Sequence, residues 1–552
     1  MTARPLTDPD RPFELLGADG GKVEAPERPD PPTTFEKRST MTMHRRFRTA
    51  SLAVAALAVA GLVLQSTAAA ARGPRSDRAT LLEYATDTWA SFEAMVDPAT
   101  GLPADNISGD LDVTTRSGYT SPTNIGAYLW STVVARDLDI ISGREARDRL
   151  TQTLDTVAGL ERHEDSGMFY NWYDEATGTK LTTWPTDGST VYPFLSSVDN
   201  AWLATALVLV SNAEPRLRDK AEAIRSTMDF GFYYNPQVRQ LRGGFWDAQP
   251  ADGAAVLGNY RDRGPDVWYT GHHYGTLNTE PRMASYLGIA WGQIPPEHYF
   301  AMFRTFPNTC DWSWPEQRPV GEWKEYLGVP VFEGAYRYRG MQLVPTWGGS
   351  MFEALMVDLF VPEAEWGPRS WGVNHPLIVR AQIEHGMDEA GYGYWGFSPA
   401  SNPAGGYREY GVDQIGMATD GYTSDQERTL VDPGWDDPAC LRAPSTPTGY
   451  GDGVVTPHAS FLALPYAKEA ALTNLARIRT ELGAYGPGGF YDSVAVRSGV
   501  VAERYLSLDQ GMVMAAIGNE LRNGAVQRYV VRGPIQRVIK PLLGIEEFNA
   551  FG

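Results

Sequence analysis

The stretch Ser196-Ser-Val-Asp-Asn-Ala-Trp-Leu-Ala-Thr-Ala-Leu-Val-Leu-Val-Ser-Asn212 is strongly apolar after its first turn. Its spacing of apolar residues predicts a helix over Val198–Asn212. Asp199 stands in the first turn, where free N–H groups and the helix dipole stabilise a carboxylate. Asp199 is therefore either a simple helix cap or an acid that the helix presents at its amino end.

The same periodicity recurs along the chain and predicts a largely helical protein. Long loops rich in Gly, Pro and aromatic residues separate the helices at 163–195, 232–278, 305–348 and 389–453, without a comparable run of alternating strand residues. Long loops on helical pairs indicate one face specialised for binding. The predicted helices are Ala79–Met95, Asn124–Asp139, Arg144–Leu160, Val198–Asn212, Arg216–Met228, Thr279–Trp291, Pro296–Phe303, Ser350–Phe360, Pro376–Met387, Thr456–Leu464, Lys468–Leu482 and Arg504–Leu521.

Acidic residues recur beside the predicted helix starts. Glu280 precedes a proline suited to a first helical turn, and Glu353 follows Ser350 by three residues, as in a capping box. Capping alone would explain each of these acids. Asp199, Glu280, Glu353 and Asp420, however, are spaced by about one or two helical hairpins with their loops. In a closed ring of helices such positions would converge on one face.

Converging carboxylates would suit the cleavage of a glycosidic bond. That reaction needs a carboxylic acid to protonate the leaving oxygen and a carboxylate to activate water or attack the anomeric carbon. Aromatic side chains can stack on sugar rings, and the loops are rich in them. Any one of these rings could instead pack in the core, but their concentration in loops favours a binding surface. The candidates are Trp172, Trp184, Trp246, Trp268, Tyr269, Trp312, Trp314, Trp347 and Trp395.

The overall composition excludes several other functions. A net charge of −19 and a pI near 4.9 argue against nucleic acid or an anionic membrane as the main partner. The chain has no Walker loop, GxSxG elbow or HExxH zinc motif. The loop carboxylates Asp420, Asp425 and Asp452 do not follow EF-hand spacing. We therefore expect neither a metal ion nor a cofactor.

The N-terminus predicts export. Arg45, Arg46 and Arg48 precede a short apolar run and a stretch of small residues, so residues 41–71 read as a signal peptide and residues 1–40 as a non-native or disordered leader. We expect one catalytic domain over residues 75–528, a C-terminal tail over 529–552, and no membrane segment after signal cleavage. Cys310 and Cys440 are either one disulfide or two unpaired thiols.

Several motifs occur in the order typical of the bacterial glucoamylase-like domain family. The C-terminal two-thirds of the chain resembles that family, which is related to endo-β-1,2-glucanases and to the transglycosylase domain of cyclic β-1,2-glucan synthases. Residues 78–240 also resemble an uncharacterised helical domain often found beside it. The motifs are Val198-Asp-Asn-Ala-Trp-Leu203, Asn278-Thr-Glu-Pro-Arg-Met-Ala-Ser-Tyr-Leu-Gly-Ile-Ala290, Trp347-Gly-Gly-Ser-Met-Phe-Glu-Ala-Leu-Met356, Ala418-Thr-Asp-Gly-Tyr422, Gly451-Asp-Gly-Val-Val-Thr-Pro457, Gly489-Phe-Tyr-Asp492 and Tyr505-Leu-Ser-Leu-Asp-Gln-Gly511.

The resemblance implies an all-α (α/α)6 toroid with aromatic-rich loops on one face. It implies Glu280 as the general acid, Glu353 as the second catalytic carboxylate, and a proton-transfer or binding role for Asp199. Where synthase-type domains carry Gly-Ile-Ser-Glu, this chain has Gly396-Phe-Ser-Pro399, which could change the substrate or the reaction. The residues expected to bind the sugar are Trp184, Trp246, Trp268, Tyr269, His273, Tyr274, Arg282, Trp347, Trp395, Asp420, Asp452, Asp492 and Asp509.

Three functions fit these features. The first is an exported, monomeric glycoside hydrolase or transglycosylase that acts on an oligo- or polysaccharide, with a β-1,2-linked glucan as the best single substrate. The second is a glycan-binding protein of the cell envelope that lacks a working acid pair. The third is a polysaccharide lyase, for which His272, His273 and Tyr274 would supply the base.

Overall fold

The computed structural model describes residues 76–251, 253–308, 317–417 and 450–552. The protein is predominantly helical, as the sequence predicted, and each predicted helix overlaps an observed one. The α-helices are α2 (Asp77–Met95), α3 (Pro122–Asp137), α4 (Gly143–Gly159), α5 (Ser197–Ala213), α6 (Arg218–Arg225), α7 (Arg282–Ala290), α8 (Glu297–Ala301), α9 (Met351–Leu355), α10 (Glu363–Trp366), α11 (Trp371–Glu384), α12 (Pro457–Leu462), α13 (Leu464–Glu481), α14 (Ser507–Leu521), α15 (Ala525–Val530) and α16 (Pro534–Ile545).

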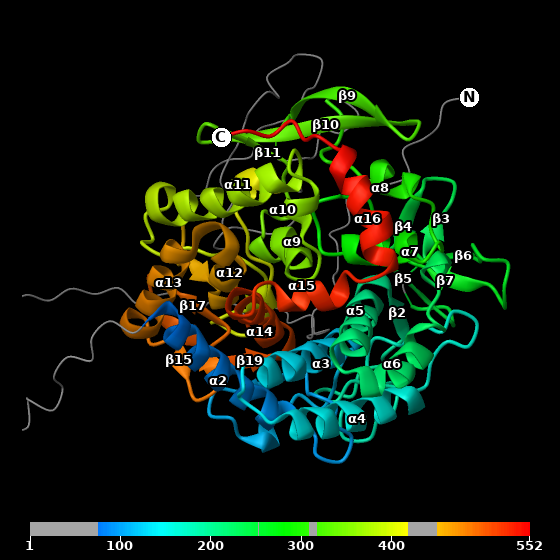
Figure 1. Ribbon diagram of the computed structural model, residues 1–552, viewed down its shortest axis with the longest axis horizontal. Helices are drawn as coiled ribbons and strands as arrows, with labels where there is room; N and C mark the ends of the chain where they lie inside the picture. Colours follow the sequence, from blue (N-terminus) through cyan, green and yellow to red (C-terminus); the bar gives the residue numbers. More distant parts are fainter. Residues whose placement is uncertain (1–75, 252, 309–316, 418–449) are drawn as a thin grey trace, which may run out of the picture.

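The helices form a ring, seen from one end in Figure 1. An inner series runs α3, α5, α7, α9, α12 and α14, and α14 packs back against α3. The contact between α7 and α9 is strengthened by Arg282, whose guanidinium donates to the carbonyls of Glu353 at 2.9 Å and Ala354 at 2.7 Å. Outside this series, α2, α4, α6, α11 and α13 pack on their inner neighbours.

The composition of each helix explains its position. In α5 nearly every side chain is buried, and the helix has no polar face to turn to water. By contrast, α4 buries one stripe, in which Leu150, Leu154 and Val157 recur at helical spacing, and it exposes charged residues on the opposite side. Helices that are apolar all round therefore line the inside of the ring, and amphipathic helices cover it.

The loops contain short antiparallel strands that the sequence analysis did not predict. Most are two or three residues long, too short for a period of two to be read from sequence. The strands are β1 (Asn106–Ser108), β2 (Phe194–Ser196), β3 (Tyr234–Asn235), β4 (Gln240–Arg242), β5 (Gly244–Trp246), β6 (Val256–Gly258), β7 (Val267–Tyr269), β8 (His273–Tyr274), β9 (Val320–Tyr326), β10 (Val329–Tyr338), β11 (Met341–Leu343), β12 (Ala400–Ser401), β13 (Tyr407–Arg408), β14 (Val454–Val455), β15 (Tyr485–Gly486), β16 (Gly489–Phe490), β17 (Ser493–Ala495), β18 (Val500–Ala502) and β19 (Arg504–Leu506).

The longest of these sheets is the hairpin of β9 and β10, which falls within a predicted loop. Tyr326 pairs with Val329, and the two residues between them, Leu327 and Gly328, have φ values of 51° and 75°. Two consecutive positive φ values suit the tight turn of a right-twisted hairpin. The alternation of β9 is masked because the strand is largely exposed and carries charged residues.

The C-terminal segment 529–552, expected to be a tail, contains α16, which packs on α7 and α10. Just after α16, Glu546 is fully buried and forms an ion pair with Arg304. None of the helices in the described part of the chain combines the length and apolar character needed to cross a membrane.

Candidate active site

Acidic residues meet where the inner helices begin. Asp199 is in the first turn of α5, Glu280 lies just before α7, and Glu353 is in the first turn of α9. The N-cap of α5 is Ser196, whose hydroxyl accepts from the backbone N–H of Asp199 at 3.2 Å. Because Ser196 caps the helix, the carboxylate of Asp199 is available for another role.

A direct contact joins two of the three predicted catalytic acids, and the charge of the third, Asp199, acts on Glu280. Glu353 Oε2 accepts a hydrogen bond of 2.8 Å from the backbone N–H of Glu280. Trp202, one turn beyond Asp199 on α5, donates its indole N–H to Glu280 Oε2, also at 2.8 Å. Asp199 Oδ1 accepts from the hydroxyl of Thr123 on α3 at 2.6 Å. Three acids that are far apart in sequence therefore occupy one end of the ring.

The surroundings favour the protonated form of Glu280. Burial and the nearby charge of Glu353 hold the pKa of Glu280 well above its usual value, although the hydrogen bond from Trp202 opposes this. Burial also raises the pKa of Asp199. Glu280 and Asp199 nevertheless keep part of their surface accessible, so a ligand can reach them.

Tyr274, predicted to bind substrate, lies beside these acids on β8. Burial and the charges of Glu280, Asp199 and Glu353 raise the pKa of its hydroxyl. The phenol is therefore a hydrogen-bond donor at neutral pH. Its neighbour His273 accepts a hydrogen bond of 3.0 Å at Nε2 from the amide of Asn235, and burial lowers the pKa of His273 to about 3.

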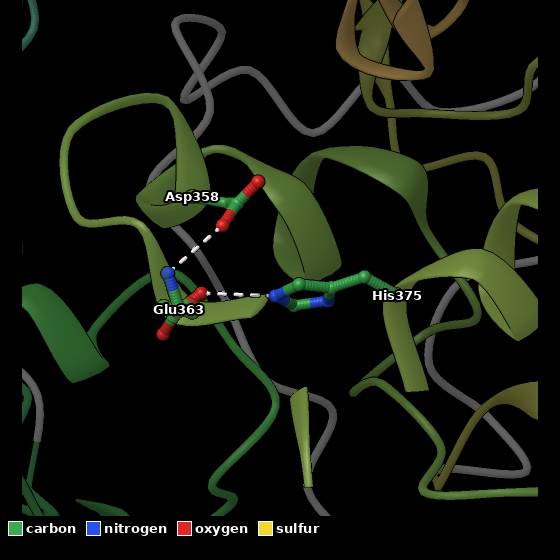
Figure 2. Close-up of side chains that lie close together, drawn as sticks. All are labelled: Asp358, Glu363 and His375. Atoms are coloured by element: carbon green, nitrogen blue, oxygen red, sulfur yellow. Dashed lines mark hydrogen bonds and ion pairs between the residues drawn. The ribbon is translucent and has the colours of Figure 1, made fainter. Parts of the chain in front are cut away.

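Arg282 stabilises the site through its bonds to α9 and α10, and it does not lie where it could contact a ligand. Its side chain is fully buried and bonds both oxygens of Glu363 at 2.8 Å. Although burial alone would raise the pKa of Glu363, Arg282 and His375 bring it down to about 2. Figure 2 shows Glu363 between Asp358 and His375, with its backbone N–H donating to Asp358 and its carboxylate facing the imidazole. The prediction that Arg282 binds sugar is therefore corrected to a positioning role for α9.

A second group of acids borders the first. Asp492 follows β16, and Asp509 is in the first turn of α14; both were predicted to bind substrate, and both are buried. Burial raises the pKa of each, and their carboxyl groups lie within reach of one another. The charges of Asp509, Asp492 and Glu280 all act on Tyr407, which is 39% exposed. Tyr407 therefore lies between the two acidic groups.

Three members of this region were not predicted from the sequence: Asp105, Tyr407 and Glu409. Burial, and secondarily the charge of Glu353, raise the pKa of Glu409 to about 7. Asp105 accepts a hydrogen bond of 2.8 Å from Asn124 on α3, and its charge acts on both Asp199 and Asp492. These residues lie in loops or in a two-residue strand, where no periodicity marks them. The available signal was that Tyr407 and Glu409 stand in an aromatic, glycine-rich loop.

The predicted aromatic residues fall into different positions. Trp246 and Trp268 are cross-strand partners on β5 and β7 and stay partly exposed, as does Trp347. Trp184 packs against Tyr119, with ring centroids 4.6 Å apart, and is mostly buried. Trp246, Trp268 and Trp347 therefore keep a surface that a sugar could contact.

Two of the predicted aromatic contacts are corrected. Tyr269 is fully buried, stacks on Tyr260, and donates its hydroxyl to the carbonyl of Phe232 at 2.8 Å. Trp395 is 2% exposed and lines a cavity between α11 and α13, among residues that include Ile383 and Arg477. Both rings therefore pack inside the protein. The sequence alone does not distinguish an aromatic residue that packs from one that binds sugar.

Asp452 is held by the backbone and hydroxyl of Ser498, at 2.7 and 2.5 Å. These bonds fix a turn beside β17 and β18 and give Asp452 a structural role. Asp420, Cys310, Cys440 and the predicted signal peptide lie outside the described residues.

Comparison with known proteins supports the resemblance drawn from the motifs. A family model described as "Putative glucoamylase" matches residues 322–534, and one described as "Protein of unknown function (DUF3131)" matches residues 83–237. The chain is 25% identical over 578 residues to the cyclic β-(1,2)-glucan synthase NdvB of Rhizobium meliloti, covering 83% of this chain and 18% of that protein. The chain thus spans about a fifth of the length of this curated relative.

Solved structures share the fold. A putative glucoamylase from Bacteroides uniformis aligns with a TM-score of 0.58 at 16% identity, over 86% of this chain and 98% of that one. The endo-β-1,2-glucanase of Chitinophaga pinensis aligns with a TM-score of 0.57 at 15% identity, over 85% and 99%. That of Talaromyces funiculosus gives 0.57 at 13% identity, over 84% and 89%. The predicted similarity to glucoamylase-like proteins and to proteins of β-1,2-glucan chemistry is confirmed.

Proposed function

We propose that this protein is a glycoside hydrolase or transglycosylase that acts on a glucan, with β-1,2-linked glucan as the preferred substrate. The observation that carries the proposal is the environment of Glu280. The residue is partly exposed, its carboxyl group accepts a hydrogen bond from Trp202, and it lies beside Glu353 with a pKa well above its usual value. The similarity to a cyclic β-1,2-glucan synthase and the fold shared with endo-β-1,2-glucanases support both the reaction class and the linkage.

In this mechanism Glu280 is the general acid. A protonated carboxyl can give its proton to the glycosidic oxygen as the bond to the anomeric carbon breaks. A second carboxylate then activates water or a sugar hydroxyl, or attacks the anomeric carbon. Glu353 is our first candidate for that role, with Asp199 assisting. Glu409 is a further candidate, because burial and the charge of Glu353 raise its pKa to about 7.

The wider assignments are part of the same proposal. We assign the ring to an (α/α)6 toroid because six inner helices follow one another within the described residues, and hydrogen bonds join the amino-terminal parts of α3, α5, α7 and α9 at the acids. One catalytic domain over residues 75–528 is consistent with the contact of α14 with α2 and α3. Export remains a proposal that rests on the sequence of residues 41–71.

The lyase alternative is disfavoured by charge. A lyase removes a proton from an acidic sugar, so it must bind an anion and hold a base of suitable pKa. Here Tyr274 faces three acids, which raise the pKa of its hydroxyl, and His273 has a pKa of about 3. Neither residue is suited to be that base.

The test is turnover of defined glucans by the protein from about Arg72 onward. Linear β-1,2-, β-1,3-, β-1,4- and α-1,4-glucans are incubated with wild type and with Glu280→Gln, and new oligosaccharides are separated by chromatography. We expect product from the β-1,2-glucan and a loss of about 10³-fold in Glu280→Gln, within the range for a general acid. Glu469→Gln, an exposed acid on α13, is the matched control.

Sugar binding without turnover by wild type, measured by calorimetry on the same panel, would replace the enzyme by a glycan-binding protein. Product from another glucan alone would retain the enzyme and reject the linkage. Circular dichroism of Glu280→Gln establishes that any loss of activity is not a loss of fold.

A further inference from the structure

A buried cluster of His458, Asp492 and Asp509 stands beside the proposed active site. His458 is in the first turn of α12, Asp509 is in the first turn of α14, and Asp492 follows β16. The three side chains each offer a ligand atom, and these atoms lie within 4.8 Å of one another. All three residues are no more than 4% exposed.

The polar atoms of this cluster are poorly satisfied. Among the described residues, both ring nitrogens of His458, Asp492 Oδ1 and Asp509 Oδ2 have no hydrogen-bond partner. His458 Nδ1 nevertheless points at the acids, at 3.5 Å from Asp509 Oδ2. Each buried polar atom without a partner costs about 1–3 kcal/mol, and a buried charge costs more. One such atom from each of the three side chains lies close to the others, and a shared partner would satisfy them together.

The charges around this cluster also favour a bound cation. Asp492 and Asp509 act on each other, and the charge of Asp105 acts on both. Two carboxyl groups so close together cannot both ionise unless a positive charge lies between them. A cation held by both would relieve the repulsion and would also take up a nitrogen of His458.

The trio Asp358, Glu363 and His375 provides an internal comparison (Figure 2). Its ligand atoms also lie within 4.8 Å of one another, and it too is buried. There, however, Arg282 binds both oxygens of Glu363, and Tyr466 donates to Asp358 at 2.7 Å. Apart from Nδ1 of His375, the protein itself satisfies the polar atoms that face one another in this trio, so the trio has much less need of a metal ion.

We propose that His458, Asp492 and Asp509 bind one first-row divalent cation, Zn²⁺ or Mn²⁺. One imidazole with two carboxylates suits these ions better than Ca²⁺, which prefers oxygen alone. Metal–ligand bonds of about 2.0–2.2 Å would draw the three side chains slightly closer than they now lie. The backbone N–H of Ser401 donates to Asp492 Oδ2 at 2.5 Å, and this bond would orient the carboxylate toward the ion.

The site goes beyond the proposed glucan chemistry and does not depend on it. No motif in the sequence indicated it, because the three ligands come from separate segments without metal-ligand spacing. The proposed ion would tie α12 to α14 and to the loop after β16 at the edge of the acidic region.

Metal binding is measured directly on the chain from about Arg72 onward, after treatment with EDTA. Zn²⁺ is titrated by calorimetry and Mn²⁺ by electron paramagnetic resonance. We expect one equivalent of at least one of these ions to bind, with Ca²⁺ at least about 10-fold weaker. Asp509→Asn and His458→Gln should each weaken binding by at least about 100-fold. Glu469→Gln should bind as wild type does.

Two results would overturn the proposal. The first is folded wild type that binds neither Zn²⁺ nor Mn²⁺ at millimolar concentration, which would leave a carboxyl pair sharing a proton. The second is binding that survives both substitutions. If the variants do not fold, X-ray absorption of the zinc-loaded wild type decides, since one imidazole in a nitrogen and oxygen shell is required. Activity is not part of this test, so its outcome is separate from that of the glucan assay.

Discussion

The indole N–H of Trp202 donates to Glu280 at 2.8 Å, and this bond moderates the pKa of the proposed acid. A hydrogen bond to the charged form of a carboxyl lowers its pKa, whereas burial and Glu353 raise the pKa of Glu280. The balance keeps Glu280 protonated yet still able to release its proton. The pKa of Glu280 thus depends partly on Trp202, which lies in the same apolar stretch that predicts a helix in the sequence.

Trp202→Phe removes that donor and should raise the pKa of Glu280 further. A hydrogen bond to a charged group contributes about 1.5–3 kcal/mol, or roughly one to two pKa units. Because a general acid works only while protonated, the basic limb of the pH–rate profile should move about one to two units upward. Activity at the optimum should fall about 10-fold as the acid loses its orientation.

The matched control is Trp130→Phe. Trp130 is equally buried, packs against Trp202, and donates its indole N–H to the carbonyl of Gly511, away from Glu280. Both substitutions should destabilise the protein similarly, but only Trp202→Phe should move the basic limb. Equal pH profiles for the two variants would mean that the Trp202 bond does not tune Glu280.

At the residue scale, sequence alone predicted the acids that open helices and missed those on loops. Asp199, Glu280 and Glu353 were predicted because a carboxylate beside an apolar run has a readable position, and the structure brings all three together. Glu409 and Asp105 have no such mark. Whether a ring packs or binds also depends on tertiary burial, which is why Tyr269 was misassigned.

At the scale of elements, Arg282 fixes α9 relative to α7. It donates to the carbonyls of Glu353 and Ala354 and pairs with Glu363 on α10. A rigid connection of this kind holds Glu353 in place beside Glu280. The sequence predicted that the acidic helix starts would converge on one face. It could not predict the hydrogen bonds and ion pairs between helices, such as those of Arg282, that hold them there.

Arg282→Met should destabilise the protein by about 3–5 kcal/mol, because it leaves the carboxylate of Glu363 buried without its partner. Adding Glu363→Gln removes that charge and should recover part of the loss. Urea unfolding measures both variants. Arg380→Met, which breaks the exposed pair with Glu384, should cost less than about 1 kcal/mol. A double variant no more stable than Arg282→Met would argue against a buried-charge penalty.

The helices were predictable because their apolar spacing is long and regular, and the strands were not. Helix α2 was expected at Ala79–Met95 and is found at Asp77–Met95. Hairpin β9–β10 was missed because β9 lies on the surface with charged residues on both faces. The pairing of β9 with β10 depends on the turn at Leu327 and Gly328 and on the burial of most residues of β10.

At the scale of the whole molecule, the chain end is bound to its middle by a buried polar cluster. Glu546, after α16, accepts from the hydroxyl of Tyr299 at 2.5 Å and pairs with Arg304. Glu333 on β10 is fully buried nearby, and the charges of Arg304 and Glu546 both act on it. One arginine thus faces two glutamates from distant parts of the chain, which the expectation of a surface tail did not include.

This imbalance makes stability depend on pH. Burial raises the pKa of Glu333 from 4.5 to about 8, although Arg304 opposes the shift. Between these two values the folded protein holds a proton that the unfolded chain releases, so the free energy of unfolding falls as pH rises from about 4.5 to 8. Below that window both states are protonated, and above it the loss is complete.

Glu333→Gln abolishes this titration while keeping the shape of the side chain. Relative to wild type, the variant should gain about 4 kcal/mol in free energy of unfolding between pH 4 and pH 8. Urea unfolding at several pH values measures the difference, and Glu325→Gln on the exposed face of the same hairpin should leave the wild-type curve unchanged. If the curves of wild type and Glu333→Gln run parallel across this range, Glu333 is already ionised in the fold, and Arg304 neutralises both glutamates.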